Sequence, residues 1–180
     1  DPVAAACRVL DQVKVDRDTR AGVVGAGRLG LLVAQVLRHV GAHVTVMVRS
    51  ERSLTAANGL GLETATLDAA LTSLARQLDL VVDATRGPAG FAAGAPLLRP
   101  RGTVVVKSTF HGDTPISFTP IVVDEITVVG SRWGPFERAI ELLGAGAIDV
   151  RPLVTATYPL EQYAQAFDRA RDGLKVILTI

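Results

Sequence analysis

The stretch that decides the fold is VVGAGRLGLLVAQVLRHVGAHVTVMVRSERS, residues 23–53. A short apolar run ends in glycines, and a helical pattern follows until Gly41, after which a second apolar run begins. Gly25, Gly27 and Gly30 form G-x-G-x-x-G between the first strand and the helix. Here the first glycine permits a tight turn, the second lets backbone approach a pyrophosphate, and the third allows close helix–strand packing. The stretch therefore predicts a dinucleotide site; the alternative is that the glycines serve packing alone.

The start of this helix supplies the predicted phosphate contacts. Free amide groups and the helix dipole at a helix N-terminus both favour a bound anion. The residues expected to bind the pyrophosphate are Gly25, Gly27, Arg28, Leu29 and Gly30.

No acidic residue lies where the second strand ends, from Val44 to Ser50. Folds that bind NAD place Asp or Glu there to accept the ribose hydroxyls. Here Arg49, Ser50 and Arg52 follow the strand, and guanidinium and hydroxyl groups can hold a 2′-phosphate that a carboxylate would repel. The sequence therefore favours NADP over NAD. Two alternatives remain: Glu51 reaches the ribose of NAD, or the arginines belong to a solvated helix N-terminus.

Composition limits the class of protein. Of 180 residues 48 % are hydrophobic and only 4 % are aromatic, which suits helices packed on a buried parallel sheet. The net charge of +1, without a basic block, predicts neither a nucleic-acid nor a membrane partner. The single cysteine, Cys7, excludes an internal disulfide and agrees with a cytoplasmic location. The opening DPVAAACRVL has no targeting pattern, and we expect it to follow a cut within a longer protein.

Apolar runs and helical patterns alternate along the chain, which predicts an α/β fold with a doubly wound, six-stranded parallel Rossmann sheet. Helices are expected over Pro2–Val13, 28–41, Glu51–Asn58, Asp68–Gln77, Gly90–Leu98 and Pro135–Leu143. Strands are expected over 21–27, His43–Val48, Leu62–Thr64, Leu80–Ala84, Thr103–Val106 and Glu125–Gly130. Residues 108–120 are predicted to be turn-rich.

Three parts are expected along the chain. Residues 1–18 form a linking helix, and residues 19–150 form the dinucleotide-binding domain. Residues 151–180 predict a strand, a helix and a strand that the six-stranded sheet does not need. We expect them to belong to a catalytic domain most of which lies outside this sequence.

Several stretches resemble the cofactor half of the medium-chain dehydrogenases/reductases, the superfamily of zinc-containing alcohol and polyol dehydrogenases. The opening DPVAAACRVL is similar to the family's EPLA helix, and VVDATRGPAGFAAGAPLLRPRGTVVV resembles its fourth and fifth strands. The most specific stretch is VVGSRWGPFERAIELLGAGAIDVRPLVTATYPLEQYAQAFDRA, which resembles the family's closing segment. The resemblance covers nearly all of the chain.

The resemblance implies hydride transfer between an alcohol or polyol carbon and a nicotinamide cofactor. A catalytic zinc in these enzymes polarises the alcohol oxygen. Its ligands lie in an N-terminal domain outside this sequence, and His39, His43 and His111 have no ligand-like spacing. Zinc is therefore expected in the full-length protein but not on this chain.

The resemblance also implies catalytic positions. Asp1 matches the acidic residue of the EPLA motif, which lies beside the zinc; the alternative is an exposed terminal acid. Arg132 matches an active-site arginine of the polyol-type enzymes, and Trp133 an aromatic residue. The alternative for Arg132 is a strand cap or a subunit contact.

Further cofactor contacts are expected at the carboxyl ends of the fourth and fifth strands. These positions hold the ribose and carboxamide in the family, and here they are Ala84, Thr85, Lys107, Ser108 and Thr109. Lys107 departs from the small residue that many members have. It could bind substrate or cofactor, or it could point to solvent.

The leading hypothesis is the cofactor-binding part of a zinc-dependent alcohol or polyol dehydrogenase. The alternatives are a zinc-free NADPH-dependent quinone or enoyl reductase of the same superfamily, and a non-catalytic dinucleotide sensor. The stretches DPVAAA and GSRWGPF favour the zinc group, and YPLEQYAQAF argues against a sensor. The β-branched strand at Glu125–Gly130 is expected at the sheet edge, where it predicts a homodimer.

Overall fold

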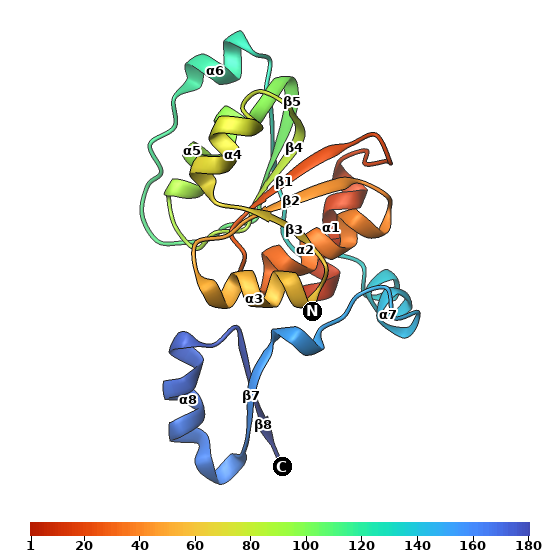
Figure 1. Cartoon of the computed structure of the whole chain (residues 1–180), viewed down its shortest axis with the longest axis vertical. Helices are drawn as coiled ribbons and strands as arrows, with labels where there is room; N and C mark the ends of the chain where they lie inside the picture. The colour runs from red at the N-terminus through yellow and green to blue at the C-terminus, as the bar shows by residue number, and fades with distance from the viewer. The chain divides into compact units, whose positions relative to one another are not determined.

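A six-stranded parallel sheet in the order β3-β2-β1-β4-β5-β6 forms the centre of the computed structural model, which describes all 180 residues (Figure 1). The chain divides into two compact units, residues 1–148 and 149–180, and this sheet belongs to the first. Its strands are β1 (Arg20–Val24), β2 (His43–Met47), β3 (Glu63–Ala65), β4 (Leu78–Asp83), β5 (Leu98–Val106) and β6 (Thr127–Gly130). The strand order reverses between β1 and β4, so the predicted doubly wound Rossmann topology is confirmed.

Helices cover both faces of this sheet. They are α1 (Pro2–Gln12), α2 (Arg28–His39), α3 (Glu51–Gly59), α4 (Leu67–Ser73), α5 (Ala89–Gly94), α6 (Phe118–Val123) and α7 (Phe136–Gly144). On one face α4 and α5 bury Ala70 and Phe91 against Val81 and Val104 (Figure 1). On the other face α2 is buried from Gly30 to Leu37, with α1 packed against it. The central strands β1, β2 and β4 are largely buried because both faces are covered.

The structure corrects three boundaries. The fourth predicted helix ends at Ser73, four residues before Gln77, and Arg76 then takes a left-handed conformation with φ of +56°. Strand β5 begins at Leu98 instead of Thr103, with an irregular register against β4. The third correction is α6, which begins at Phe118, inside the stretch expected to be turns, and ends at Val123. Its proline, Pro120, lies in the first turn, where a missing amide donor costs little.

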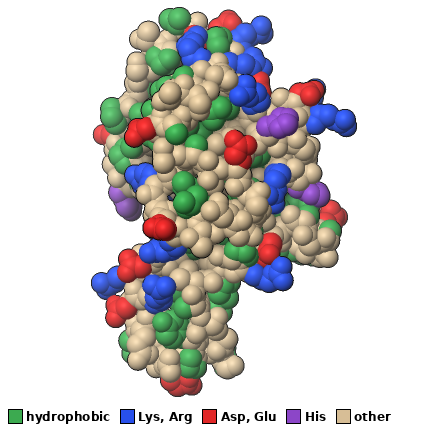
Figure 2. Space-filling view, viewed as in Figure 1, with side chains coloured by type: hydrophobic (Ala, Val, Ile, Leu, Met, Phe, Trp, Pro, Cys, Tyr) green, Lys and Arg blue, Asp and Glu red, His purple; other side chains and the backbone are tan.

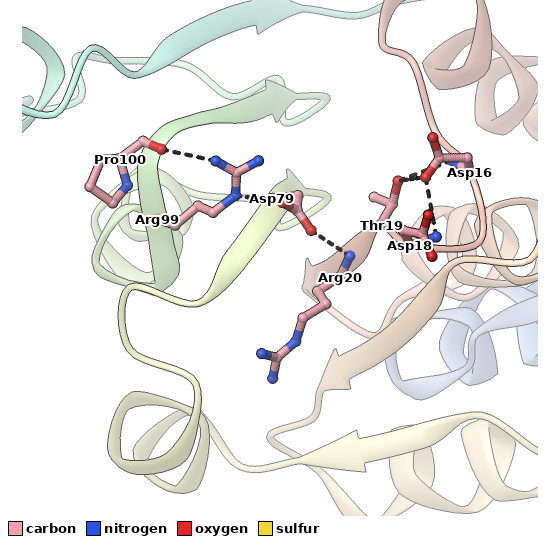
Figure 3. Close-up of polar contacts among 7 residues, drawn as sticks. All are labelled: Asp16, Asp18, Thr19, Arg20, Asp79, Arg99 and Pro100. Atoms are coloured by element: carbon pink, nitrogen blue, oxygen red, sulfur yellow. Dashed lines mark hydrogen bonds and ion pairs between the residues drawn. The ribbon is translucent and has the colours of Figure 1, made fainter.

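The amino ends of the central strands are tied together by Asp79 of β4 (Figure 3). Its carboxylate accepts a hydrogen bond of 2.7 Å from the backbone amide of Arg20 in β1 and one from the Arg99 side chain in β5. Burial acts to raise the pKa of Asp79, but these hydrogen bonds outweigh it and hold the pKa below its ordinary value. One carboxylate thus links three strands at the edge opposite the glycine motif.

The second unit is a small β-α-β motif, as predicted from residues 151–180. It contains β7 (Val154–Pro159), α8 (Tyr163–Asp172) and β8 (Lys175–Thr179), and the two strands pair in parallel. Apolar side chains remain on its surface (Figure 2), among them Phe167, which is 68 % exposed. Within the whole chain, no helix combines the length and the apolar character that a membrane crossing requires.

Candidate dinucleotide site

The three glycines differ in what surrounds them, and the surroundings of Gly25 and Gly30 agree with the turn and the close packing predicted for them. Gly25 has φ of +104°, and a Cβ there would lie 2.8 Å from the backbone of Ala84 and Thr85. A Cβ at Gly30 would overlap the carbonyl oxygen of Gly25. Gly27 has no neighbouring atom within 4 Å of a Cβ position. The first and third glycines are therefore required by the fold, whereas the second leaves open space above the loop.

The N-terminus of α2 opens onto this space. Gly27 precedes the helix in an extended conformation, and no side chain caps the helix end. The carbonyl of Gly27 accepts the amide of Leu31, so the amides of Arg28, Leu29 and Gly30 precede the first helical donor and have no acceptor within the helix. A helix end with free amides and no acidic cap fits a pyrophosphate.

The residues after β2 come together at the start of α3. Ser50 is the N-cap of this helix, and its hydroxyl accepts a hydrogen bond of 3.3 Å from the backbone amide of Ser53. Arg49 and Arg52 are exposed and form no ion pair, and Glu51 is exposed beside them. The predicted phosphate clamp therefore consists of two free guanidinium groups around a serine that also caps a helix.

Sequence reasoning missed a buried carboxylate at the end of β4. Asp83 is 3 % exposed and accepts hydrogen bonds from the Thr85 hydroxyl at 2.8 Å and the Ser108 hydroxyl at 2.7 Å. A Cβ at Gly90 in α5 would overlap this carboxylate, so only glycine fits there. The acid followed by a hydroxyl residue in VVDATRG was the available signal. The network fixes the ends of β4 and β5, where two of the predicted contact residues lie.

Lys107 does not point to solvent, which corrects one of its two predicted placements. The residue is 8 % exposed, and its ammonium donates a hydrogen bond of 2.8 Å to the Ser131 hydroxyl. Burial, together with a smaller contribution from the charge of Arg8, lowers the pKa of Lys107 to about 8. The carboxyl end of β5 therefore carries a buried positive charge. Thr109, two residues further on, is exposed.

The two predicted catalytic residues are exposed and lie on neighbouring segments. The Arg132 guanidinium lies over the Trp133 ring, 5.3 Å from its centroid, and Trp133 has φ of +41°. A Cβ at Gly134 would overlap the carbonyl of Ala4, so this turn packs against the first turn of α1. Asp1 precedes that turn as the N-cap of α1, without a side-chain hydrogen bond.

The histidines lie apart in the fold. His39 ends α2, His43 begins β2, and His111 lies in the loop after β5. No three His, Cys, Asp or Glu side chains form a group that could hold a metal ion. The glycine loop and the α2 N-terminus fit a dinucleotide.

The switch point between β1 and β4, the open glycine loop and the uncapped helix are the features of a dinucleotide-binding fold of the Rossmann type. Residues 29–145 match the family model described as zinc-binding dehydrogenase. The chain belongs to the zinc-binding dehydrogenase family, as the sequence resemblance predicted.

Curated relatives of the chain are sugar and polyol dehydrogenases. D-arabitol-phosphate dehydrogenase of Enterococcus avium is 28 % identical over 88 % of this chain and 49 % of its own length. Glucose 1-dehydrogenase of Thermoproteus tenax is 32 % identical, again over 88 % of this chain and 49 % of its own. The chain spans about half the length of the curated relatives that it matches.

Solved structures share the fold. L-idonate 5-dehydrogenase of Escherichia coli superposes with a TM-score of 0.88 at 23 % identity, over 99 % of this chain and 55 % of its own. A zinc-binding dehydrogenase of Sinorhizobium meliloti, solved with NADP, superposes with a TM-score of 0.84 at 23 % identity. The match covers 92 % of this chain and 53 % of that one. The alcohol dehydrogenase rspB of Escherichia coli, solved with NADH, superposes with a TM-score of 0.88 at 23 % identity. The match covers 99 % of this chain and 57 % of that one.

Proposed function

We propose that this chain is the cofactor-binding part of a zinc-dependent alcohol or polyol dehydrogenase that transfers hydride between an alcohol carbon and NAD(P). The observation that carries the proposal is the open space at Gly27, between two glycines that the fold itself requires. The relatives support it, because their names include an arabitol-phosphate and a glucose dehydrogenase, and related structures were solved with NADP and NADH.

The pyrophosphate would lie over Gly27, Arg28 and Leu29 at the start of α2, where free amides face the open space. The adenosine half would extend towards β2, so that Arg49, Ser50 and Arg52 meet a 2′-phosphate. The exposed, unpaired guanidinium groups and the absence of a carboxylate from Val44 to Ser50 support NADP as the preferred cofactor.

The nicotinamide half would then lie over the ends of β4 and β5. Ala84, Thr85, Ser108 and Thr109 line this side of the sheet edge, and Asp83 holds two of their hydroxyls in place. Lys107 lies in the same half of the site. Parallel sheets bind ligands at this edge, at the switch point, which supports the arrangement.

Zinc would be held by residues outside this chain, and when bound it would act as a Lewis acid on the alcohol oxygen. Asp1 and Arg132 would place a carboxylate and a guanidinium beside the reacting alcohol, since their segments pack together through Gly134 and Ala4. Residues 151–180 would complete the catalytic domain, and residues 1–18 would link it to the dinucleotide-binding domain.

The full-length enzyme is proposed to be a cytoplasmic homodimer. Strand β6 is the last strand of the sheet, and Val128 is 45 % exposed on it. An uncovered β-branched edge favours pairing with a second copy of itself.

The proposal is tested by titrating the chain with NADPH and NADH in parallel, following the fluorescence of its single tryptophan, Trp133, with calorimetry as a second readout. Tighter binding of NADPH supports both the site and the phosphate clamp. Tighter binding of NADH means that Glu51 or backbone groups hold the ribose. Binding of neither cofactor overturns the proposed function.

A further inference from the structure

Lys107 is a buried cation with an unusual set of partners. It is 8 % exposed, whereas the Lys14 side chain is 92 % exposed. Its ammonium donates to the neutral hydroxyl of Ser131, and no carboxylate forms an ion pair with it. Lysines are rarely buried without such a partner, because burial costs the charge its hydration. A buried lysine without a counterion indicates that its positive charge has a functional role.

The acidic groups near Lys107 are occupied elsewhere. Asp83 is paired with Val106 across the sheet and faces α5, where its carboxylate accepts hydrogen bonds from two hydroxyl residues. Lys107 follows Val106 and lies on the opposite face, where Arg8 of α1 adds a like charge. Asp11 of α1 lies within ion-pair distance of Arg8 and of Arg138 in α7.

Ser131, the partner of Lys107, is followed in the chain by Arg132, whose guanidinium is stacked on Trp133. The groups around Lys107 thus add positive charge and leave the ammonium uncompensated.

This charge lies in the half of the site left for the nicotinamide. The glycine loop after β1 fixes the pyrophosphate, and the clamp at α3 takes the adenosine half, so the nicotinamide extends over β4 and β5. The oxidised nicotinamide ring carries a positive charge. Reduction adds a hydride, which brings one proton and two electrons, and leaves the ring neutral.

We propose that the ammonium of Lys107 makes the site select the redox state of the cofactor, so that it binds the reduced dinucleotide more tightly than the oxidised one. This inference rests on the proposed function. An ammonium in the same half of a partly buried site repels a positively charged ring, which corresponds to at least about a tenfold difference in affinity. The reduced ring escapes this repulsion.

The test compares dissociation constants for NADP⁺ and NADPH, by Trp133 fluorescence and calorimetry, at about pH 6.5 and about pH 9.5. Because the pKa of Lys107 is about 8, the ammonium predominates at the lower pH and the neutral amine at the higher. The ratio of the NADP⁺ constant to the NADPH constant is expected to be about tenfold larger at the lower pH. The 2′-phosphate is common to both cofactors, so its own titration cancels in the ratio.

Three variants separate charge from structure. Lys107→Met removes the charge with little change in length, and is expected to tighten NADP⁺ binding, leave NADPH binding nearly unchanged and abolish the pH dependence. Lys107→Arg keeps the charge at both pH values and is expected to keep the ratio large throughout. Lys14→Met is the matched control at an exposed lysine and should behave as the wild type.

A ratio that is the same in the wild type, Lys107→Met and Lys107→Arg overturns the inference, as does an equal loss of both affinities in Lys107→Met. If Lys107→Met does not fold, the wild-type pH series and Lys107→Arg decide the question. Failure of the wild type to bind either form overturns the proposed function instead, so the two failures are distinguishable.

Discussion

The Ser108 hydroxyl lies 2.7 Å from the Asp83 carboxylate, and this bond joins the carboxyl end of β5 to that of β4. The same carboxylate oxygen accepts the hydroxyl and the amide of Thr85. A single buried acid therefore organises the carboxyl ends of β4 and β5, beside the glycine loop.

Replacing this acid is expected to weaken the fold. Asp83→Ala leaves the Thr85 and Ser108 hydroxyls without their charged acceptor, which should lower the free energy of unfolding by about 2–4 kcal/mol. Urea denaturation followed by circular dichroism measures the change. Asp113→Ala, at an exposed loop acid, is the control and should leave the midpoint in place. Equal midpoints for the two variants would show that the network adds no stability.

Two glycine variants should separate binding from folding. Gly27→Val places a side chain in open space, so the fold should persist while the pyrophosphate is blocked and NADPH binding is lost. Gly30→Val drives its side chain into the Gly25 carbonyl and should disrupt α2 and β1. Calorimetric titration and thermal unfolding of both variants provide the comparison. Unchanged NADPH affinity in a folded Gly27→Val protein would contradict the pyrophosphate assignment.

Cofactor preference should depend on Ser50. Ser50→Asp keeps an N-cap acceptor for α3 but places a negative charge at the predicted 2′-phosphate position. NADPH affinity should fall at least about tenfold, and NADH affinity should not fall. Ser50→Ala is the matched control: it loses the cap, at a cost of about 1 kcal/mol, without adding charge. A parallel loss of both cofactors in Ser50→Asp would place the phosphate elsewhere.

Lys107 should also leave a pH signature in stability. Its folded pKa of about 8 lies below the ordinary value of 10.5, so between these limits the unfolded chain binds more protons. The contribution of Lys107 to the free energy of unfolding therefore rises with pH across this window, and below about pH 8 the fold bears the full cost of the buried charge.

Lys107→Met should consequently be more stable than the wild type at neutral pH, by up to about 3 kcal/mol, with the gap closing towards pH 10.5. Urea midpoints measured at several pH values test this. A gap that does not vary with pH would assign the effect to packing.

The edge strand provides a test of assembly. Val128→Lys introduces a charge on the exposed side of β6 and should convert a dimer to a monomer in sedimentation experiments. Leu54→Lys changes an exposed apolar residue on α3, which packs beside β3, and should leave the assembly unchanged. A wild-type monomer would contradict the dimer proposal.

The sequence was sufficient for the fold because its signals are local and repeated. The glycine motif, the apolar strands and the helical spacing of residues 28–41 together specify β1, α2 and β2. Helix and strand ends that depend on tertiary contacts were harder to predict from the sequence. The end of α4 depends on a left-handed residue whose side chain is held by Asp124, 48 positions away. No residue within 68–77 indicates that Arg76 will pair with Asp124.

The candidate site divides in the same way. Gly25, Gly27 and Gly30 were assigned roles from spacing alone; the structure agrees with the turn at Gly25 and the packing at Gly30, and the pyrophosphate contact at Gly27 stays a prediction. The Asp83 network was missed because its partners lie on two strands that meet only in the folded chain. The burial of Lys107 was left open for a similar reason. A lysine at a strand end is ordinarily solvated, and only the packing of β5, β6 and α1 around it excludes water.

The parallel pair β7–β8 has consequences for how the chain unfolds. Two strands and one helix bury little, and two-stranded sheets are marginal without further support. The amide hydrogens of β7 and β8 should therefore exchange with deuterium well before those of β1 and β4, which have partners on both sides. Thermal melting of the isolated chain should then proceed in two stages, so that one midpoint temperature describes neither unit.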